Sequence, residues 1–271
     1  MRAFPVRYQK GFLMSVAAAT GAQPASRQAD HHEMRDHMVA KVSETTLERD
    51  PFCHVYLQEI FPPALYPTVL ESLPSPEAYT PLNPRLYSRK DGTSTRDQFF
   101  LTAENLAKLP PESAAFWNSV VSAVTDGALK RAIFAKLAPD LAERFSIPEA
   151  EVPEMKCVYE VVLFRDTQDY RIKPHPDGLN KIVTMQFYLP PDTSTLELGT
   201  SLFRHERGLL GGTFHEVKRF EFNPNSAYAF AVSDSSTRKS WHGRERLTGF
   251  TGVRNTLMVL FQRDSPRQYQ M

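Results

Sequence analysis

The chain has 271 residues, of which 41% are hydrophobic and 23% charged, and its formal net charge is +1 at pH 7. This length and composition suit a globular chain that buries a sizeable core. The near-neutral balance gives no reason to expect a nucleic-acid or membrane partner, and no stretch approaches the ~20 apolar residues of a membrane span. The two cysteines, Cys53 and Cys157, lack the spacing of a zinc or redox motif. Because free thiols suit a reducing compartment, we expect a cytoplasmic protein.

The first 45 residues carry early positive charges, a weak apolar patch at Gly11–Ala19 and many small side chains. This pattern loosely mimics a signal peptide, but the patch holds few large apolar residues. We interpret residues 1–45 as a flexible leader and residues 46–271 as a single domain. A secretory segment, or a start at Met14, are the alternatives for this region.

The first half of the domain is predicted to be mainly helical, with helical support over residues 60–145. Residues 50–62 contain a strand-like run, and residues 76–102 are polar and rich in turns. The specific elements predicted here are a helix at Pro63–Leu73, a strand at Gln98–Thr102, and two packed helices within Ser113–Phe145 that break near Asp126 and Gly127.

The second half contains apolar runs of strand length, separated by polar inserts. These runs are Tyr159–Phe164, Lys181–Leu189, Ala227–Val232 and Asn255–Phe261. Helices followed by strands indicate an α+β fold that is mainly β, with a strand-rich core over residues 155–262.

A His-x-Asp pair, His175 and Asp177, lies between the first two of these runs. Residues two apart in an extended segment face the same side, so both side chains can converge on one ion. Pro174 and Pro176 stiffen the backbone, and Gly178 lets the chain turn away after the carboxylate. An isolated pair of this kind is more often a solvated turn, so a metal site requires a further ligand elsewhere in the chain.

A third ligand candidate, His242, comes after the run Ala227–Val232 and a polar loop. Two imidazoles and one carboxylate form the facial triad that holds Fe(II) and leaves other positions open. His205 and His215 are alternative third ligands, but both lie among charged residues typical of solvated loops or a hairpin edge. Neither precedes an apolar strand headed by arginine at a comparable spacing.

Arg254 heads the last apolar run, twelve residues after His242. A buried arginine needs an anionic partner, and a bound dicarboxylate would provide one through bidentate hydrogen bonds. Arg244 and Arg246 compete for this role, but they lie too close to His242 in the chain to reach the far end of a diacid that also chelates the metal. We interpret both as surface charges.

The pattern His-x-Asp, a long gap, His and then Arg resembles the Fe(II)/2-oxoglutarate-dependent oxygenase superfamily over residues 155–262. The resemblance implies a double-stranded β-helix, or jelly roll, buttressed by helices. It implies that His175, Asp177 and His242 bind Fe(II), that Arg254 binds 2-oxoglutarate, and that O2 is consumed with release of succinate and CO2. Thr256, on the same side as Arg254, and Tyr188 and Gln186, on one strand face, are further candidates for the cosubstrate pocket. Tyr188 could equally be a core aromatic with a satisfied hydroxyl.

The expected reaction is oxidation, most simply hydroxylation, of a C–H bond in a small-molecule substrate. Halogenation is not expected, because halogenating relatives lack the carboxylate ligand that Asp177 supplies. The alternatives are a non-oxidative cupin-like metal-binding protein or isomerase, and an oxygenase acting on a protein side chain. The segment Leu82–Gln98 could act as a lid that recruits an anionic substrate, although a solvated charge run is the simpler interpretation; its cations are Arg85, Arg89, Lys90 and Arg96. Gly199 is expected to be structural, and the sequence leaves the substrate and the oligomeric state open.

Overall fold

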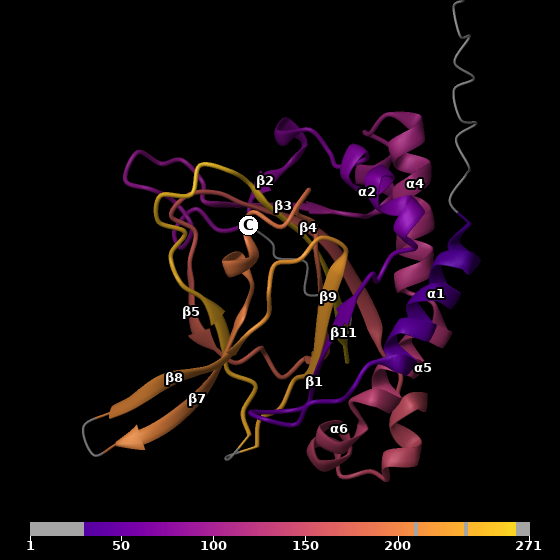
Figure 1. Ribbon diagram of the computed structural model, residues 1–271, viewed down its shortest axis with the longest axis vertical. Helices are drawn as coiled ribbons and strands as arrows, with labels where there is room; N and C mark the ends of the chain where they lie inside the picture. Colours follow the sequence, from indigo (N-terminus) through magenta and orange to yellow (C-terminus); the bar gives the residue numbers. More distant parts are fainter. Residues whose placement is uncertain (1–29, 209–210, 236–237, 264–271) are drawn as a thin grey trace, which may run out of the picture.

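The computed structural model describes residues 30–208, 211–235 and 238–263, and it contains two antiparallel β-sheets with helices on one side (Figure 1). The larger sheet has the strand order β1-β9-β6-β11-β4-β3-β2, and the smaller has the order β5-β10-β7-β8. The larger sheet consists of β1 (His54–Gln58), β2 (Thr80–Pro81), β3 (Arg96–Phe100), β4 (Val158–Asp166), β6 (Lys181–Tyr188), β9 (Ser226–Ala231) and β11 (Arg254–Gln262). The smaller consists of β5 (Ile172–His175), β7 (Ser201–Gly208), β8 (Gly211–Arg219) and β10 (His242–Arg244).

The chain path from β4 to β11 winds between the two sheets. It passes from β4 in the larger sheet to β5 in the smaller, returns to β6, crosses to the β7–β8 hairpin, and then takes β9, β10 and β11 in alternate sheets. This winding is that of a double-stranded β-helix. The predicted fold class, α+β and mainly β with a jelly-roll core, is confirmed.

Helices cover the face of the larger sheet that points away from the smaller one (Figure 1). Trp117 belongs to this apolar layer, is completely buried, and donates from Nε1 to the carbonyl of Ser72 at 2.6 Å. Phe134 packs edge-on against Phe261 of β11. The helices are α1 (His31–Glu44), α2 (Tyr66–Glu71), α3 (Ala103–Leu106), α4 (Pro111–Val124), α5 (Gly127–Lys136) and α6 (Ala138–Phe145), with short 3-10 turns η1 (Pro63–Leu65), η2 (Pro76–Ala78), η3 (Glu149–Glu154) and η4 (Leu196–Leu198).

The helix α1 corrects the prediction of a flexible leader over residues 1–45. Asp30 caps the helix by accepting from the backbone N–H of His32, and Met34, Met38 and Val42, spaced by four, are buried in the core. Residues 31–44 are therefore part of the folded domain. The apolar residues of this helix are few and stand among many charged and polar side chains, and they form a buried face only when α4 and α5 pack against them. Residues 1–29 lie outside the described part of the chain.

The predicted break near Asp126 is confirmed, because the side chain of Asp126 caps α5 by accepting from the N–H of Ala128 at 2.7 Å. The prediction of two helices was wrong, because three form. Pro139 stands at the start of α6, where proline fits the first turn but cannot continue a preceding helix. The helix predicted at Pro63–Leu73 forms as η1 followed by α2. Among the described residues no helix has the length and apolar character needed to cross a membrane.

Candidate metal centre

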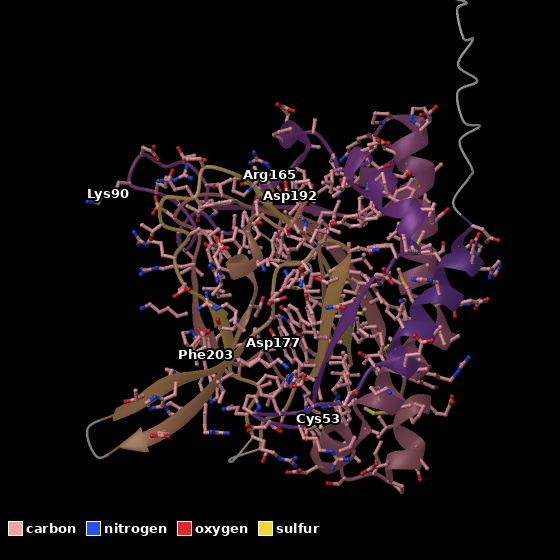
Figure 2. All side chains as sticks on the ribbon, in the orientation of Figure 1. Cys53, Lys90, Arg165, Asp177, Asp192 and Phe203 are labelled. Carbon is pink, nitrogen blue, oxygen red and sulfur yellow. The ribbon has the colours of Figure 1, made fainter. Side chains whose placement is uncertain are left out.

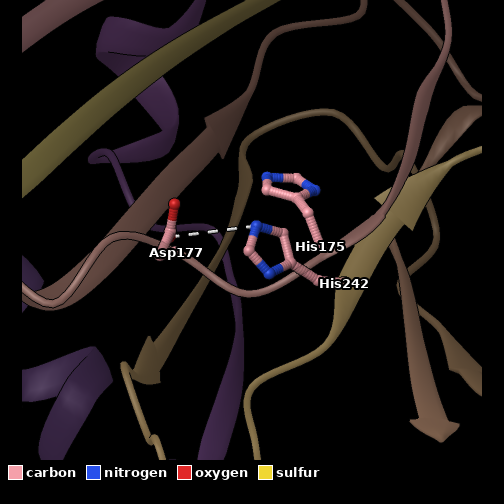
Figure 3. A group of neighbouring side chains, drawn as sticks. All are labelled: His175, Asp177 and His242. Atoms are coloured by element: carbon pink, nitrogen blue, oxygen red, sulfur yellow. Dashed lines mark ion pairs between the residues drawn. The ribbon is translucent and has the colours of Figure 1, made fainter.

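The three predicted metal ligands lie close together at the end of β5 and the start of β10, which are neighbouring strands of the smaller sheet (Figure 3). His175 ends β5 and is paired in register with His242, which begins β10, while Asp177 lies two residues beyond β5. The ligand atoms of these three side chains all lie within 4.8 Å of one another, and the two imidazole centroids are 4.4 Å apart. The close pairing of His175 with His242 comes from the β5–β10 register, which the sequence spacing alone did not reveal.

Backbone carbonyls fix the orientation of both imidazoles. Nδ1 of His175 lies 3.0 Å from the carbonyl of Lys173, and Nδ1 of His242 lies 2.9 Å from the carbonyl of Ser240. A carbonyl oxygen can only accept, so each Nδ1 carries the proton and donates. The neutral rings therefore keep Nε2 as a free lone pair, which is the tautomer that a metal ligand requires.

The ionisation of the three groups suits metal ligation. Burial lowers the pKa of His242 to about 4 and also lowers the pKa of His175, so both rings are neutral near pH 7. Burial alone would raise the pKa of Asp177, but the charge of Lys181 and the hydrogen bonds from Lys181 and Thr184 hold it well below its usual range. The site thus presents two neutral imidazoles and one carboxylate.

Both oxygens of Asp177 have protein partners that orient the carboxylate. Lys181 donates from Nζ to Oδ1 at 2.5 Å, and Thr184 donates from Oγ1 to Oδ2 at 2.6 Å. Nε2 of His242 lies 3.8 Å from Oδ2 of Asp177 (Figure 3). Two imidazoles and one carboxylate, each held by outer contacts, form a donor set that fits Fe(II) with three protein ligands and open positions. Lys181 and Thr184 were not identified from the sequence, although their places four and seven residues after Asp177 could have suggested them.

The two alternative histidines lie on the β7–β8 hairpin, which projects from the body of the molecule (Figure 1). The ring of His205 packs against Phe214 and Trp241, with centroid distances of 4.6 and 5.4 Å. His215 is more than half exposed and lies 3.4 Å from Glu206. Within the described residues, the metal-competent cluster contains neither of them.

Arg254 is deeply buried at the start of β11, as its position in an apolar strand predicts. The anionic partner that a buried arginine needs is supplied within the protein. Its Nη1 donates to Oδ2 of Asp166 at 2.8 Å, and its Nε donates to the carbonyl of Leu198 at 2.7 Å. Asp166 is paired with Arg254 across the β4–β11 ladder, a contact between residues far apart in sequence.

The other two arginines that come after His242 differ from each other. Arg244 is buried, which corrects its interpretation as a surface charge, and it donates from Nη1 to the carbonyls of Glu197 and Gly199. Burial, together with the charge of nearby Arg254, lowers the pKa of Arg244 to about 10. Arg246 is about half exposed and lies 3.7 Å from Asp169, as expected of a surface charge.

The remaining cosubstrate candidates form a buried polar network between the sheets. Gln186 donates from Nε2 to Oγ1 of Thr256 at 2.9 Å, and the hydroxyl of Tyr228 donates to Oε1 of Gln186 at 2.6 Å. The hydroxyl of Tyr188 accepts from the N–H of Thr200 at 2.7 Å, and Tyr188 pairs with Thr256 across β6 and β11. Tyr188 is therefore a core aromatic with a satisfied hydroxyl, and Tyr228 is a network member that the sequence pattern did not single out.

The basic segment Leu82–Gln98 does not lie over the metal centre. A cavity of about 470 Å³ is lined by Arg89 and Lys90 of this segment and by Arg171, which precedes β5, whereas His175 ends that strand. Figure 2 shows Lys90 on an outer loop, well separated from Asp177. The other cations of the segment therefore do not contact the metal ligands, whereas Arg96 differs from them because it is buried inside the barrel.

Gly199 has a structural role, as predicted. A Cβ atom added at Gly199 would lie 1.5 Å from the carbonyl oxygen of Phe220. No side chain fits at this distance, so the position needs glycine to let two backbones approach.

No family model matches the chain, and no curated protein matches it at a significant level. Among solved structures, it is similar to a prolyl-4-hydroxylase from Pseudomonas putida, with 10% identity, a TM-score of 0.45, and coverage of 85% of this chain and 99% of that one. It is also similar to a prolyl hydroxylase from Trichoplax adhaerens in complex with a hypoxia inducible factor peptide fragment, with 9% identity, a TM-score of 0.47, and coverage of 86% and 90%. A third is dioxygenase for auxin oxidation 1 from Arabidopsis thaliana in a binary complex with 2-oxoglutarate, with 11% identity, a TM-score of 0.48, and coverage of 86% and 87%. Because these sequence identities and TM-scores are low, the structural similarities do not establish which reaction this protein catalyses.

Proposed function

We propose that this protein is an Fe(II)- and 2-oxoglutarate-dependent dioxygenase that oxidises, by hydroxylation, a C–H bond of a small-molecule substrate. The observation that carries the proposal is the convergence of His175, Asp177 and His242 with their ligand atoms within 4.8 Å. Fe(II), 2-oxoglutarate and O2, when bound, would supply the oxidising chemistry, with release of succinate and CO2.

The side chains around the triad would prepare it for one divalent ion. The carbonyls of Lys173 and Ser240 hold the two imidazoles in the tautomer with a free Nε2. Thr184 and Lys181 hold the carboxylate of Asp177 in place and satisfy the lone pairs that a metal would not use. This prior ordering lowers the entropy that would be lost when the ligands close around an ion.

In this proposal Arg254 anchors the distal carboxylate of 2-oxoglutarate, and Tyr188, Gln186 and Thr256 shape the wall of the same space. All four side chains are buried between the sheets, where a charge-assisted hydrogen bond is strong because water is excluded. Arg254 stacks over the rings of Tyr188 and Phe222, at 5.3 and 4.9 Å, which fixes the plane of its guanidinium.

A non-oxidative cupin-like protein or isomerase would use the same barrel and histidines, but it would not need the buried guanidinium of Arg254 at the head of β11. An oxygenase acting on a protein side chain would share every feature of the centre. The choice of a small molecule rests on the nearly neutral charge and the lack of an evident recognition module in the sequence.

The experiment that tests the proposal is succinate release from 2-oxoglutarate in air with added Fe(II) and ascorbate. Slow release without any added substrate is expected from the wild type, and none above background from the Asp177→Gly variant. Anaerobic binding of Fe(II) and then 2-oxoglutarate, monitored by visible absorption, separates binding from turnover. A wild-type protein that binds neither would contradict the oxygenase assignment.

A further inference from the structure

Three charged side chains form a row across the larger sheet, on the face that lines the barrel. Asp166 of β4 pairs in register with Arg254 of β11 on one side and with Arg96 of β3 on the other. All three are buried, with 2% of Arg254, none of Asp166 and 6% of Arg96 exposed. Two guanidinium cations and one carboxylate leave this row with one net positive charge.

Asp166 is shared unequally between the two arginines. Its Oδ2 accepts a 2.8 Å hydrogen bond from Arg254, whereas its Oδ1 lies 3.5 Å from Nε of Arg96 without a hydrogen bond. Both Oδ1 of Asp166 and Nε of Arg96 are wholly buried and unbonded. Buried groups of this kind are rare because each forfeits its hydration without compensation.

Arg96 is held in place by stacking rather than by hydrogen bonds. Its guanidinium lies 3.9 Å from the ring centroid of Phe164 and 4.7 Å from that of Tyr170. Among the described residues its side chain has no hydrogen bond, and Asp166 is its only ion-pair partner. A buried cation without a hydrogen bond would be stabilised by a closer contact with a carboxylate.

Other buried carboxylates do not neutralise the row. In the described part of the chain they are Asp140, which pairs with Arg238 at 3.0 Å, and Asp177, which pairs with Lys181. Arg244 lies close enough to Arg254 to feel its charge, and its own ion-pair partner, Glu245 at 3.9 Å, is an exposed side chain outside the buried row. The interior therefore has an excess of positive charge that a carboxylate ligand would balance.

We propose that Asp166 is a movable counter-ion, which passes from Arg254 to Arg96 when the distal carboxylate of 2-oxoglutarate binds Arg254. The proposal rests on the proposed function. The ligand carboxylate replaces Asp166 on Arg254, and Asp166 closes on Arg96, so the two unbonded atoms gain a hydrogen bond and the row becomes neutral. Arg96 touches no ligand in this scheme and is a positioning residue.

The scheme explains why a ligand can bind an arginine that already has a partner. Without Arg96, the Arg254–Asp166 pair would be neutral, and an incoming carboxylate would strand Asp166 in the barrel without a cation. Leaving a buried charge unpaired is strongly unfavourable. Arg96 removes that penalty, so its loss should weaken the binding of any ligand that displaces Asp166.

The test measures ligand affinity for the Mn(II)-loaded protein by calorimetry, with two probes. One is 2-oxoglutarate, and the other is 2-oxopentanoate, which has a methyl group in place of the distal carboxylate. For Arg96→Met, we expect the Kd for 2-oxoglutarate to rise by roughly 5- to 150-fold, the usual span of coupling between sites, and the Kd for 2-oxopentanoate to stay unchanged. The half-exposed Arg246→Met is the matched control and should alter neither.

A second substitution should reverse the defect. In the double variant Arg96→Met with Asp166→Asn, Arg254 is the one remaining charge, so the row again has one net positive charge. The affinity for 2-oxoglutarate should therefore return toward the wild-type value. A merely structural role for Arg96 predicts no such rescue. If Arg96→Met does not fold, the single variant Asp166→Asn decides the question. It frees Arg254 from its partner, so the affinity for 2-oxoglutarate should stay the same or rise. A fivefold loss of that affinity would contradict the scheme.

The outcomes distinguish the two proposals. If the wild type binds 2-oxoglutarate and Arg96→Met binds it equally well, the movable counter-ion is wrong and the proposed function stands. Equal weakening of both probes would also overturn it, because the effect would not depend on the distal carboxylate. If the wild type binds Mn(II) but not 2-oxoglutarate, the cosubstrate assignment itself falls, and this inference falls with it.

Discussion

The two faces of the larger sheet carry different kinds of side chain. The face toward the helices is packed almost entirely with apolar residues, among them Trp117, Phe134 and Phe261. The face toward the smaller sheet carries aromatic residues together with the row of Arg96, Asp166 and Arg254. The first face stabilises the fold, whereas the second holds charges and unbonded polar atoms that cost stability, as expected where a site must accept a ligand.

The largest effect is expected at the metal centre. Asp177→Gly removes one of three ligands, so we expect Mn(II) affinity to fall by more than about 100-fold, because loss of an outer partner alone costs about 10- to 100-fold. Succinate release should disappear. Asp192→Gly, a change to an exposed aspartate that lies apart from Asp177 (Figure 2), should alter neither. Full retention of metal binding would remove Asp177 from the ligand set.

A core substitution on the helical face should have the opposite profile. Trp117→Ala removes a fully buried indole and its hydrogen bond to Ser72, so the free energy of unfolding should fall by about 3–5 kcal/mol. Chemical denaturation measures the loss, and calorimetry below the unfolding transition should give an unchanged Mn(II) affinity. A large loss of affinity in the folded variant would mean that the two faces are not separable.

Arg144 of α6 links the two faces. It donates three hydrogen bonds, to the carbonyls of Leu179 and Lys181 in the turn after Asp177 and to that of Val232 before the loop that leads to His242. Arg144→Met should weaken Mn(II) binding by about 10-fold through looser positioning of both segments. Arg131→Met, on the exposed side of α5, is the control. An affinity equal to that of the control would show that α6 has no part in the site.

The smallest effect concerns pH. His54 is buried, and burial lowers its pKa below 6.5. His54 therefore binds a proton more readily in the unfolded chain than in the folded chain. Its contribution therefore destabilises the fold as pH falls below 6.5 and vanishes above that value. His54→Gln should make the rise of unfolding free energy between pH 5 and pH 7 shallower than in the wild type. Denaturation at a series of pH values measures both slopes, and identical slopes in the wild type and in His54→Gln would contradict the assignment.

The fold was predictable where a strand is a long apolar run. β4, β6, β9 and β11 lie within two residues of their predicted bounds because each is buried on both faces. β5 and β10 are only four and three residues long, and each mixes polar side chains with proline or glycine, so no periodicity marks them. The helix α1 was missed for a related reason. Its apolar residues are few, and they form a buried face only through contact with the helices that cover them.

The site was predictable to the extent that it depends on short spacings. The two proline-flanked ligands and the distant histidine are visible as a motif, and the structure brings them together. The pairing of Asp166 with Arg254 and Arg96 is not visible, because it depends on the order β11-β4-β3 and on the register of those strands. The burial of Arg244 was missed for the same reason, since carbonyls of η4 and the residue after it form its environment.

The most direct test of the central claim is a crystal structure of the protein grown without oxygen in the presence of Mn(II) and 2-oxoglutarate. We expect one ion bound by Nε2 of His175, Nε2 of His242 and a carboxylate oxygen of Asp177, with the distal carboxylate of 2-oxoglutarate on Arg254. An ion bound elsewhere, or a triad that stays empty at saturating Mn(II), would contradict the claim.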